Sequence, residues 1–346
     1  PLRTLVTNLI VGNSLLTAAG FPMCGESDLK TCLAMLIMDR LGIGGSFAEF
    51  HPIDFREGFV LVGHDGPHHI NIADGKPVSI VPGEGLLGAD VAFPVLHGPF
   101  GEDGATQGAL ETAGIAYAGS DVLGSAVCMD KLTLKRLCGF HGINQVDFVQ
   151  AGVTGWHEAA LELGLPVWVK PSRLGSSVGM SKVDAWDQLT DAVNLAAKHD
   201  PRVIIEGHCG GREIECSVLG NENPEASLPG EIVADADWYD YEAKYTEGRM
   251  NLAVPADLDE ETTAAVRAAA TNAFTLAGCS GLARCDFFVE EDGTILLNEI
   301  NTIPGFTQTS VYAKLWQATG IEYPDLCDRL IKLAIERHAE EAKHSF

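Results

Sequence analysis

The chain is poor in basic residues: 23 Lys and Arg stand against 48 Asp and Glu, and the formal net charge is −25. A protein that binds the phosphate backbone of DNA or RNA needs a basic surface, so this balance argues against nucleic acid as a partner. An acidic chain that holds a small anion must gather its few lysines in one place. The positions of the lysines are therefore informative.

The chain also lacks the cysteine spacing of a metal or redox motif. Its 9 cysteines are an odd number, and no two of them are separated by two residues. A zinc site or a redox pair normally has that spacing. Scattered free thiols are typical of a reducing cytosol, so we expect a cytoplasmic protein.

Long hydrophobic runs are absent too. No apolar stretch approaches the roughly 20 residues needed to span a membrane, so we expect no membrane partner. Residues 5–20 are fairly apolar behind Arg3 and imitate a secretion signal, but Asn8 and residues 12–14 interrupt the run. No rich basic flank precedes it. We favour a buried strand and turn here, with a signal peptide as the weaker alternative.

The length of 346 residues predicts two or three domains. Apolar runs at residues 90–96 and 115–117 flank a helical pattern at residues 107–113, which indicates a βαβ-type unit. The character of the chain changes at Ser125, and a helix is expected from Cys128. We expect an α/β (α+β) fold divided into residues 1–125, 126–210 and 211–346.

Other segments have clear patterns. Residues 63–85, rich in Gly, Pro, His and Asp, predict a hairpin or an irregular excursion, with His68 and His69 in a solvated loop rather than a metal site. Further strands are predicted at residues 167–171, 203–206, 213–219 (half exposed), 281–289 and 295–301, and further helices at residues 28–41, from about 185, 260–277 and 323–342.

A polar sequence closes the strand predicted at residues 295–301. Glu299 and Asn301 are two residues apart, so both side chains leave a strand from the same face. A carboxylate and an amide oxygen suit Mg²⁺ rather than zinc or copper. The turn at residues 290–293 pairs this strand with 281–289, which places Asp286 beside Glu299 and Asn301, with Arg284 adjacent. An edge strand with a polar outer face is the alternative.

A second candidate site follows the strand at residues 167–171. That strand ends in Lys170, and the loop 172–179 is rich in Gly and Ser. Glycines allow close approach of the backbone, and serine hydroxyls bind phosphate oxygens. The order differs from a P-loop, because the lysine precedes the glycines. We favour phosphate binding over a plain Gly/Ser turn.

Two more loops are candidates for a site. His97 opens a glycine-rich loop, residues 97–104, at the carboxyl end of a buried strand, where open α/β sheets place ligands. We favour a site role for His97 over a structural one. Residues 238–248 form a polar, aromatic segment of the kind that closes over a site and excludes water, with a surface excursion as the alternative.

Taken in order, these residues resemble the D-alanine–D-alanine ligases of the ATP-grasp superfamily over roughly residues 90–335. An ordered set of motifs is far more specific than any one of them. The matching stretches are His97-Gly98, residues 101–104, Met129-Asp130-Lys131, Val169-Lys170-Pro171, residues 175–179, residues 240–245, Arg284-Cys285-Asp286 and residues 298–305.

The resemblance implies a three-domain ATP-grasp fold with a Rossmann-like N-terminal domain. It implies ATP-dependent ligation of two D-alanines through a D-alanyl phosphate, for peptidoglycan precursor synthesis, with Mg²⁺ or alternatively Mn²⁺. It also assigns roles to residues. Nucleotide contacts fall on Lys131, Lys170, Ser176, Ser177, Glu206, Cys209, Glu213, Lys244 and Asn298. Metal ligands fall on Asp286, Glu299 and Asn301. Catalytic roles fall on Arg284, Gly305, Ser176, Tyr245 and Glu26, and substrate contacts on His97, Arg284, Gly305, Ser310 and Val311.

The chain departs from the family pattern at two places. The family commonly has an aromatic residue at position 208, where this chain has His208. Residues 1–50 show no clean version of the Gly-Gly turn and Glu–Ser helix start that bind the first D-alanine, and Glu26 is the one candidate there. Ligation to D-lactate or D-serine, another carboxylate–amine ligase activity, and an ATP-binding homologue with impaired ligase activity therefore remain alternatives. The oligomeric state is open, with a homodimer as one option.

Overall fold

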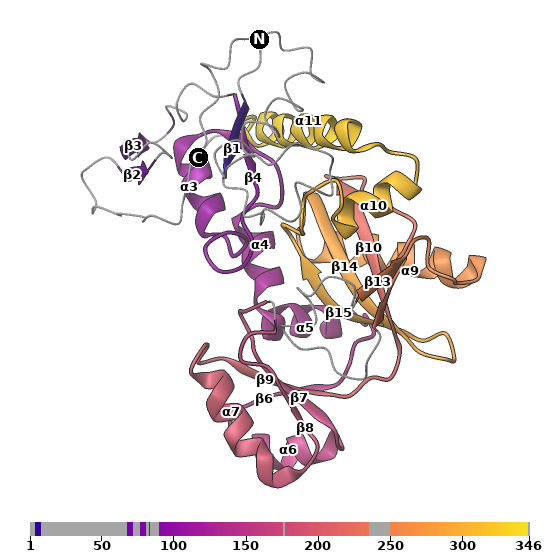
Figure 1. Cartoon of the computed structure of the whole chain (residues 1–346). Coiled ribbons are helices and arrows are strands. Elements are labelled where there is room, and N and C mark those ends of the chain that lie inside the picture. The colour runs from indigo at the N-terminus through magenta and orange to yellow at the C-terminus, as the bar shows by residue number, and fades with distance from the viewer. Residues whose placement is uncertain are drawn as a thin grey trace, which may run out of the picture.

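The computed structural model describes residues 4–7, 68–71, 77–80, 83, 90–175, 177–234 and 250–344. Its described strands form three larger sheets and one hairpin. In Figure 1 the N-terminal sheet and the last helix lie at the top, the four-stranded central sheet lies at the bottom, and the six-stranded C-terminal sheet lies on the right.

The N-terminal sheet is parallel and has the order β1(Thr4–Thr7), β4(Val91–Pro94), β5(Ala116–Tyr117). Helix α3(Ala105–Ala113) connects β4 to β5, so the βαβ prediction is confirmed. β4 is fully buried because it is the central strand and its residues are apolar. The strand expected at the start of residues 5–20 is present as β1.

The hairpin expected within residues 63–85 consists of β2(His68–Asn71) and β3(Pro77–Ile80). The prediction that His68 and His69 lie in a loop is wrong. Both residues belong to β2, because their backbones pair with Ile80 and Ser79 of β3.

Two consecutive helices replace the single helix expected near Cys128. α4(Val122–Met129) ends at Asp130, whose extended backbone breaks the helix, and α5(Lys131–Phe140) begins at the next residue. The Asp130 carboxylate accepts a hydrogen bond from the Thr133 N–H at 3.1 Å and so caps α5. Lys131 is thereby the first residue of a helix.

The central sheet is antiparallel, with the order β6(Phe148–Gln150), β9(Val203–Gly207), β7(Val167–Pro171), β8(Ser181–Val183). One face is covered by α6(Trp156–Glu162) and α7(Leu189–Ala197). A short 3-10 helix, η3(Trp186–Gln188), directly precedes α7. The predicted strands at residues 167–171 and 203–206 are confirmed. Lys170 and Glu206 point away from the apolar core that Val167, Val169 and Ile205 form.

The C-terminal sheet is also antiparallel, with the order β13(Met250–Ala253), β12(Gly230–Ala234), β10(Arg212–Gly220), β14(Gly281–Val289), β15(Ile295–Asn301), and β11(Glu225–Ala226) pairs with β10. The strand predicted at residues 213–219 is confirmed as part of β10, but the expectation that it is half exposed is wrong. From Glu215 to Gly220 every residue of β10 is buried, because the strand is central and both of its faces are covered. Ile214 and Val218 pack in the cluster under α9(Glu260–Leu276).

Helix α9 buries the predicted apolar stripe, which includes Val266, Ala270 and Phe274, against β14 and β15. The other face of the C-terminal sheet is covered by α10(Val311–Ala318) and α11(Tyr323–Glu341). Their side chains form one core cluster with Phe93 of the N-terminal sheet and Leu282 of β14. The last helix therefore ties the N-terminal sheet to the C-terminal one (Figure 1). No helix in the described part of the chain is both long and apolar enough to cross a membrane.

The core under α9 supplies a test of the fold. Phe274 is fully buried, whereas Thr275 beside it is exposed. Truncation of a buried phenylalanine leaves a cavity, so we expect Phe274→Ala to lower the free energy of unfolding by about 3–5 kcal/mol. Thr275→Ala, on the outer face of the same helix, should change it by less than about 0.5 kcal/mol. Urea unfolding followed by circular dichroism measures both, and equal losses would contradict this packing.

Candidate active site

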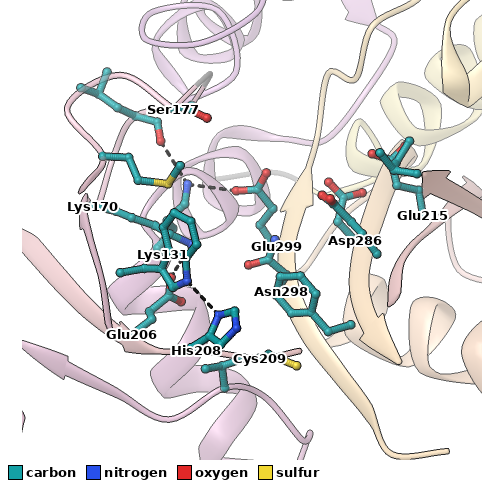
Figure 2. A pocket seen from close by; sticks show the side chains of 18 of the residues that line it. Lys131, Lys170, Ser177, Glu206, His208, Cys209, Glu215, Asp286, Asn298 and Glu299 are labelled. Atoms are coloured by element: carbon teal, nitrogen blue, oxygen red, sulfur yellow. Dashed lines mark hydrogen bonds and ion pairs between the residues drawn. The ribbon is translucent and has the colours of Figure 1, made fainter. Parts of the chain in front are cut away.

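A cavity of about 380 Å³ lies between the central and C-terminal sheets. Figure 2 shows side chains entering it from opposite sides. The lysines come from α5 and the central sheet and His208 from the segment after β9, whereas most of the acidic side chains come from the C-terminal sheet. Charged residues that line the cavity are Lys131, Lys170, Glu206, Glu213, Glu215, Arg284, Asp286 and Glu299.

Strands β14 and β15 assemble the acidic side. In their antiparallel register Arg284 lies opposite Asn301 and Asp286 lies opposite Glu299. The Arg284 guanidinium donates to both Asp286 oxygens at 2.8 Å, and the Asn301 amide nitrogen donates to Asp286 at 2.9 Å. The structure therefore brings Arg284, Asp286 and Asn301 into contact, with Glu299 opposite Asp286 in the register. Within the described residues no three His, Cys, Asp or Glu side chains form a group that could hold a metal ion.

A β-bulge explains how Asn298 joins this group. The register shifts between Asp286 and Phe287, whose partners are Glu299 and Leu297, so Asn298 has no residue opposite it. Adjacent residues of a regular strand point to opposite faces, whereas a bulge re-aims a side chain. Asn298 and Glu299 consequently both line the cavity.

Lys131 connects the two sides of the cavity. Its ammonium lies 3.0 Å from the Glu299 carboxylate and donates to the Leu174 carbonyl at 3.0 Å. Burial disfavours the ammonium, but the Glu299 carboxylate next to it holds the pKa of Lys131 above its ordinary value. Lys131 is therefore charged throughout the neutral range.

Lys170 belongs to a buried charge network on the central sheet. One Glu206 oxygen lies 2.6 Å from Lys170 Nζ, and the other lies 2.8 Å from Lys135 Nζ. Burial opposes ionisation of Glu206, but the two ammonium groups outweigh it and lower the pKa of Glu206 to about 2. Both carboxylate oxygens are thus held by lysines.

The loop predicted to bind phosphate borders the cavity. Gly175, Ser177 and Val178 line it, and Ser177 has a φ of 58°, an uncommon conformation for a residue other than glycine. The start of this loop is anchored, because Ser172 Oγ donates to the Asp130 carboxylate at 2.7 Å. Ser176 lies outside the described residues, as do Glu26, Lys244, Tyr245 and the segment 238–248.

The far end of the cavity is formed by the segment after β9. His208 and Cys209 line it with Glu213, and Trp168 Nε1 donates to His208 Nδ1 at 3.3 Å. Trp168 and Glu215 are lining residues that the sequence analysis missed. The signal for both was the period of two along a strand: Trp168 is two residues before Lys170, and Glu215 is two residues after Glu213.

The loop at residues 97–104 contacts the end of β15 rather than this cavity. His97 Nδ1 lies 2.7 Å from the Ile303 carbonyl, and the Glu102 carboxylate accepts from the N–H groups of Gly98 at 2.7 Å and Ile303 at 3.3 Å. Desolvation lowers the pKa of His97, so the neutral imidazole donates to that carbonyl. In this structure His97 therefore joins the loop after β4 to the segment after β15, and its assignment as a substrate residue stays a prediction.

Gly305 and Ser310 form a separate group next to this contact. Ser310 Oγ accepts from the Thr307 N–H at 3.0 Å, and a Cβ on Gly305 would lie only 3.3 Å from Ser310 Oγ. Val311, the next residue, reaches the cavity. The structure thus brings Gly305 and Ser310 together, and Val311 connects them to the cavity.

The described fold and cavity belong to a known class. Two antiparallel sheets with charged side chains directed into the space between them are the arrangement of the ATP-grasp enzymes. The profile of the D-ala D-ala ligase C-terminus matches residues 137–332, and that of the D-ala D-ala ligase N-terminus matches residues 71–120.

Individual proteins give the same result. The chain is 48% identical over 265 residues to D-alanine–D-alanine ligase A of Escherichia coli (strain K12), which covers 75% of this chain and 73% of that protein. It is 48% identical over 255 residues to D-alanine–D-alanine ligase of Halothermothrix orenii, covering 71% and 74%. A solved D-alanine–D-alanine ligase from Coxiella burnetii superposes with a TM-score of 0.74 at 32% identity, covering 99% and 96%. The VanG D-Ala:D-Ser ligase of Enterococcus faecalis gives 0.73 at 29% identity, covering 96% and 100%.

The chain therefore belongs to the D-alanine–D-alanine ligase family, and it is an enzyme of the ligase class with the ATP-grasp fold.

The contact at Ile303 has a pH dependence that can be measured. Burial raises the pKa of Glu102 from 4.5 to about 7. Between these two pH values the folded protein keeps a proton on Glu102 that the unfolded chain has lost. The folded state therefore gains stability from Glu102 as the pH falls from about 8 to about 5. As the pH falls from about 8 to about 5, the melting temperature of the wild type should rise relative to that of Glu102→Gln. The melting temperatures are measured without nucleotide or metal. If those of the two proteins changed by the same amount across this pH range, the raised pKa of Glu102 would be contradicted.

Proposed function

We propose that the chain ligates two D-alanines to D-alanyl-D-alanine at the expense of ATP, for peptidoglycan precursor synthesis. One observation carries the proposal: lysines from α5 and the central sheet face carboxylates from the C-terminal sheet across one cavity. A triphosphate with its metal needs both sets at once. The names of the family members to which the chain is similar support D-alanine as the substrate.

The first step is attack by one D-alanine carboxylate on the γ-phosphate of ATP, with ADP as the leaving group. We assign Lys131 and Lys170 to the phosphates, the loop with Ser176 and Ser177 to their cover, and Glu213, Cys209, Asn298 and Lys244 to the rest of the nucleotide. Glu206 acts through Lys170 in this assignment, because both of its oxygens are engaged by lysines. Phosphoryl transfer depends chiefly on positioning and charge neutralisation, which these residues supply.

The site fits a divalent metal. Asp286, Glu299 and Asn301 offer hard oxygen donors, which suit Mg²⁺ or, alternatively, Mn²⁺. A bound Mg²⁺ would neutralise charge on the phosphate oxygens. Arg284 pairs with Asp286 and Lys131 pairs with Glu299 in this structure, which supports the assignment of a cation to this position.

The second step is attack by the amine of the second D-alanine on the acyl phosphate, with phosphate as the leaving group. We assign Arg284 and the Gly305 N–H to the oxyanion of the tetrahedral intermediate, and Ser310 and Val311 to the second substrate. Tyr245, Glu26 and His97 keep their predicted roles as substrate or catalytic residues. Arg284 already lies in the cavity with its guanidinium oriented by Asp286 and Glu215.

The domain limits, the setting and the assembly complete the proposal. We place the domains at residues 1–125, 126–210 and 211–346; the sheets follow this division, although α5 also packs in the core of the C-terminal sheet through Leu134 and Cys138. Because the reaction consumes ATP and yields a cell-wall precursor, we place it in the cytoplasm. A homodimer is one option for the assembly.

A substrate panel tests the proposed activity. With ATP and Mg²⁺, D-alanine should give phosphate release and a product with the mass of D-alanyl-D-alanine. D-serine or D-lactate offered with D-alanine tests the mixed ligases, of which the D-Ala:D-Ser enzyme from Enterococcus faecalis is a solved example. Depsipeptide or D-alanyl-D-serine in excess over D-alanyl-D-alanine would overturn the assignment of the second substrate. ATP binding without D-alanine-dependent turnover would favour a homologue with impaired ligase activity.

A variant tests the role of Arg284. Arg284→Lys keeps the charge and loses the two-pronged geometry. If Arg284 stabilises the oxyanion, kcat should fall by about 10²-fold with a smaller change in KM for ATP. Arg212→Lys on β10 is the matched control, because Arg212 pairs with Glu231 at the surface. An unchanged kcat in Arg284→Lys would remove this residue from the mechanism.

A further inference from the structure

Lys135 is a buried lysine that the proposed reaction does not use directly. It lies one helical turn after Lys131 on α5 and is only 2% exposed. Its ammonium is 2.8 Å from Glu206 Oε1 and 5.8 Å from the centre of the Phe148 ring. Removing an ammonium from water is costly, so its retention in the core requires a compensating interaction.

That interaction belongs to a three-membered network. The second oxygen of Glu206 lies 2.6 Å from Lys170 Nζ, and Lys170 lines the cavity. Lys135 is not among the described residues that line the cavity. Two ammonium groups and one carboxylate leave a net charge of +1, and the positive group that faces the cavity is Lys170. Without Lys135, the pair of Lys170 and Glu206 would be neutral.

We propose that Lys135 is a positioning residue that neutralises Glu206 from behind, so that Lys170 keeps a full positive charge for the polyphosphate of the nucleotide. This inference rests on the proposed function, because it assumes that ATP binds in the cavity. Compensation of the Glu206 charge matters because the surroundings are acidic: the net charge of the chain is −25, and four carboxylates besides Glu206 line the same cavity. In a partly dry cavity an uncompensated carboxylate beside Lys170 would repel the anion strongly.

A purely structural role makes a different prediction. If Lys135 only held α5 against β9, its loss would weaken every ligand of the cavity alike, and removal of the Glu206 charge would add to the damage. If Lys135 balances charge, its loss should weaken polyphosphate ligands selectively. Removal of the Glu206 charge should then restore binding, because Lys170 would be left without a carboxylate to cancel it.

The experiment uses isothermal titration calorimetry of the full chain with Mg²⁺, with a non-hydrolysable ATP analogue and with adenosine. Lys135→Met removes the charge and keeps the aliphatic stem, and should weaken the analogue by about tenfold, as loss of a charge-assisted contact does, with adenosine unchanged. The double variant Lys135→Met/Glu206→Gln should bind the analogue within about threefold of the wild type. Arg136→Met is the matched control: it removes one charge from the same helix at an exposed position and should leave both affinities unchanged.

The outcomes separate this inference from the proposed function. Failure of the wild type to bind the analogue would overturn both. Normal binding by the wild type with no loss in Lys135→Met, or equal losses for the analogue and adenosine, would overturn the role of Lys135 alone. Where Lys135→Met does not fold, the double variant decides, because it leaves neither Lys135 nor Glu206 charged in the core: the proposal predicts an affinity for the analogue within about threefold of the wild type, and a loss of about tenfold would overturn it.

Discussion

The pairing of β14 with β15 is the constraint on which the site depends. Its antiparallel register places Arg284 and Asp286 opposite Asn301 and Glu299, and its bulge adds Asn298 to the same side. The pair is held from behind by α9, whose apolar stripe buries the opposite face of both strands. The polar group is therefore rigid because its support is a packed core rather than a loop.

Charge is distributed across the cavity by element. α5 and β7 supply lysines, whereas β10, β14 and β15 supply most of the carboxylates. In this structure the two sets satisfy each other through the pair of Lys131 and Glu299, while Lys170 is held by Glu206 on its own sheet. In the proposed function, a nucleotide with its metal would take the place of the first of these contacts. This proposal would account for the lysines that so acidic a chain places around the cavity.

The connection to the N-terminal sheet follows from the same strand. Immediately after β15, Ile303 exchanges hydrogen bonds with His97 and Glu102 of the N-terminal loop. α11 completes the connection through a core shared with Phe93 and Leu282. The end of β15 is thus joined directly to the loop that the resemblance assigns to substrate binding.

The sequence by itself determined the local structure and the chemical types of the site. Three features could be predicted because each depends on residues close in the chain: the period of two at Glu299 and Asn301, the turn at residues 290–293 and the apolar stripe of α9. Only the tertiary structure decided that β10 is buried on both faces, that Asn298 lies in a bulge, and that Glu206 is held by Lys135 and Lys170. Burial, register shifts and long-range ion pairs depend on which segments pack together. No periodicity within one segment records that information.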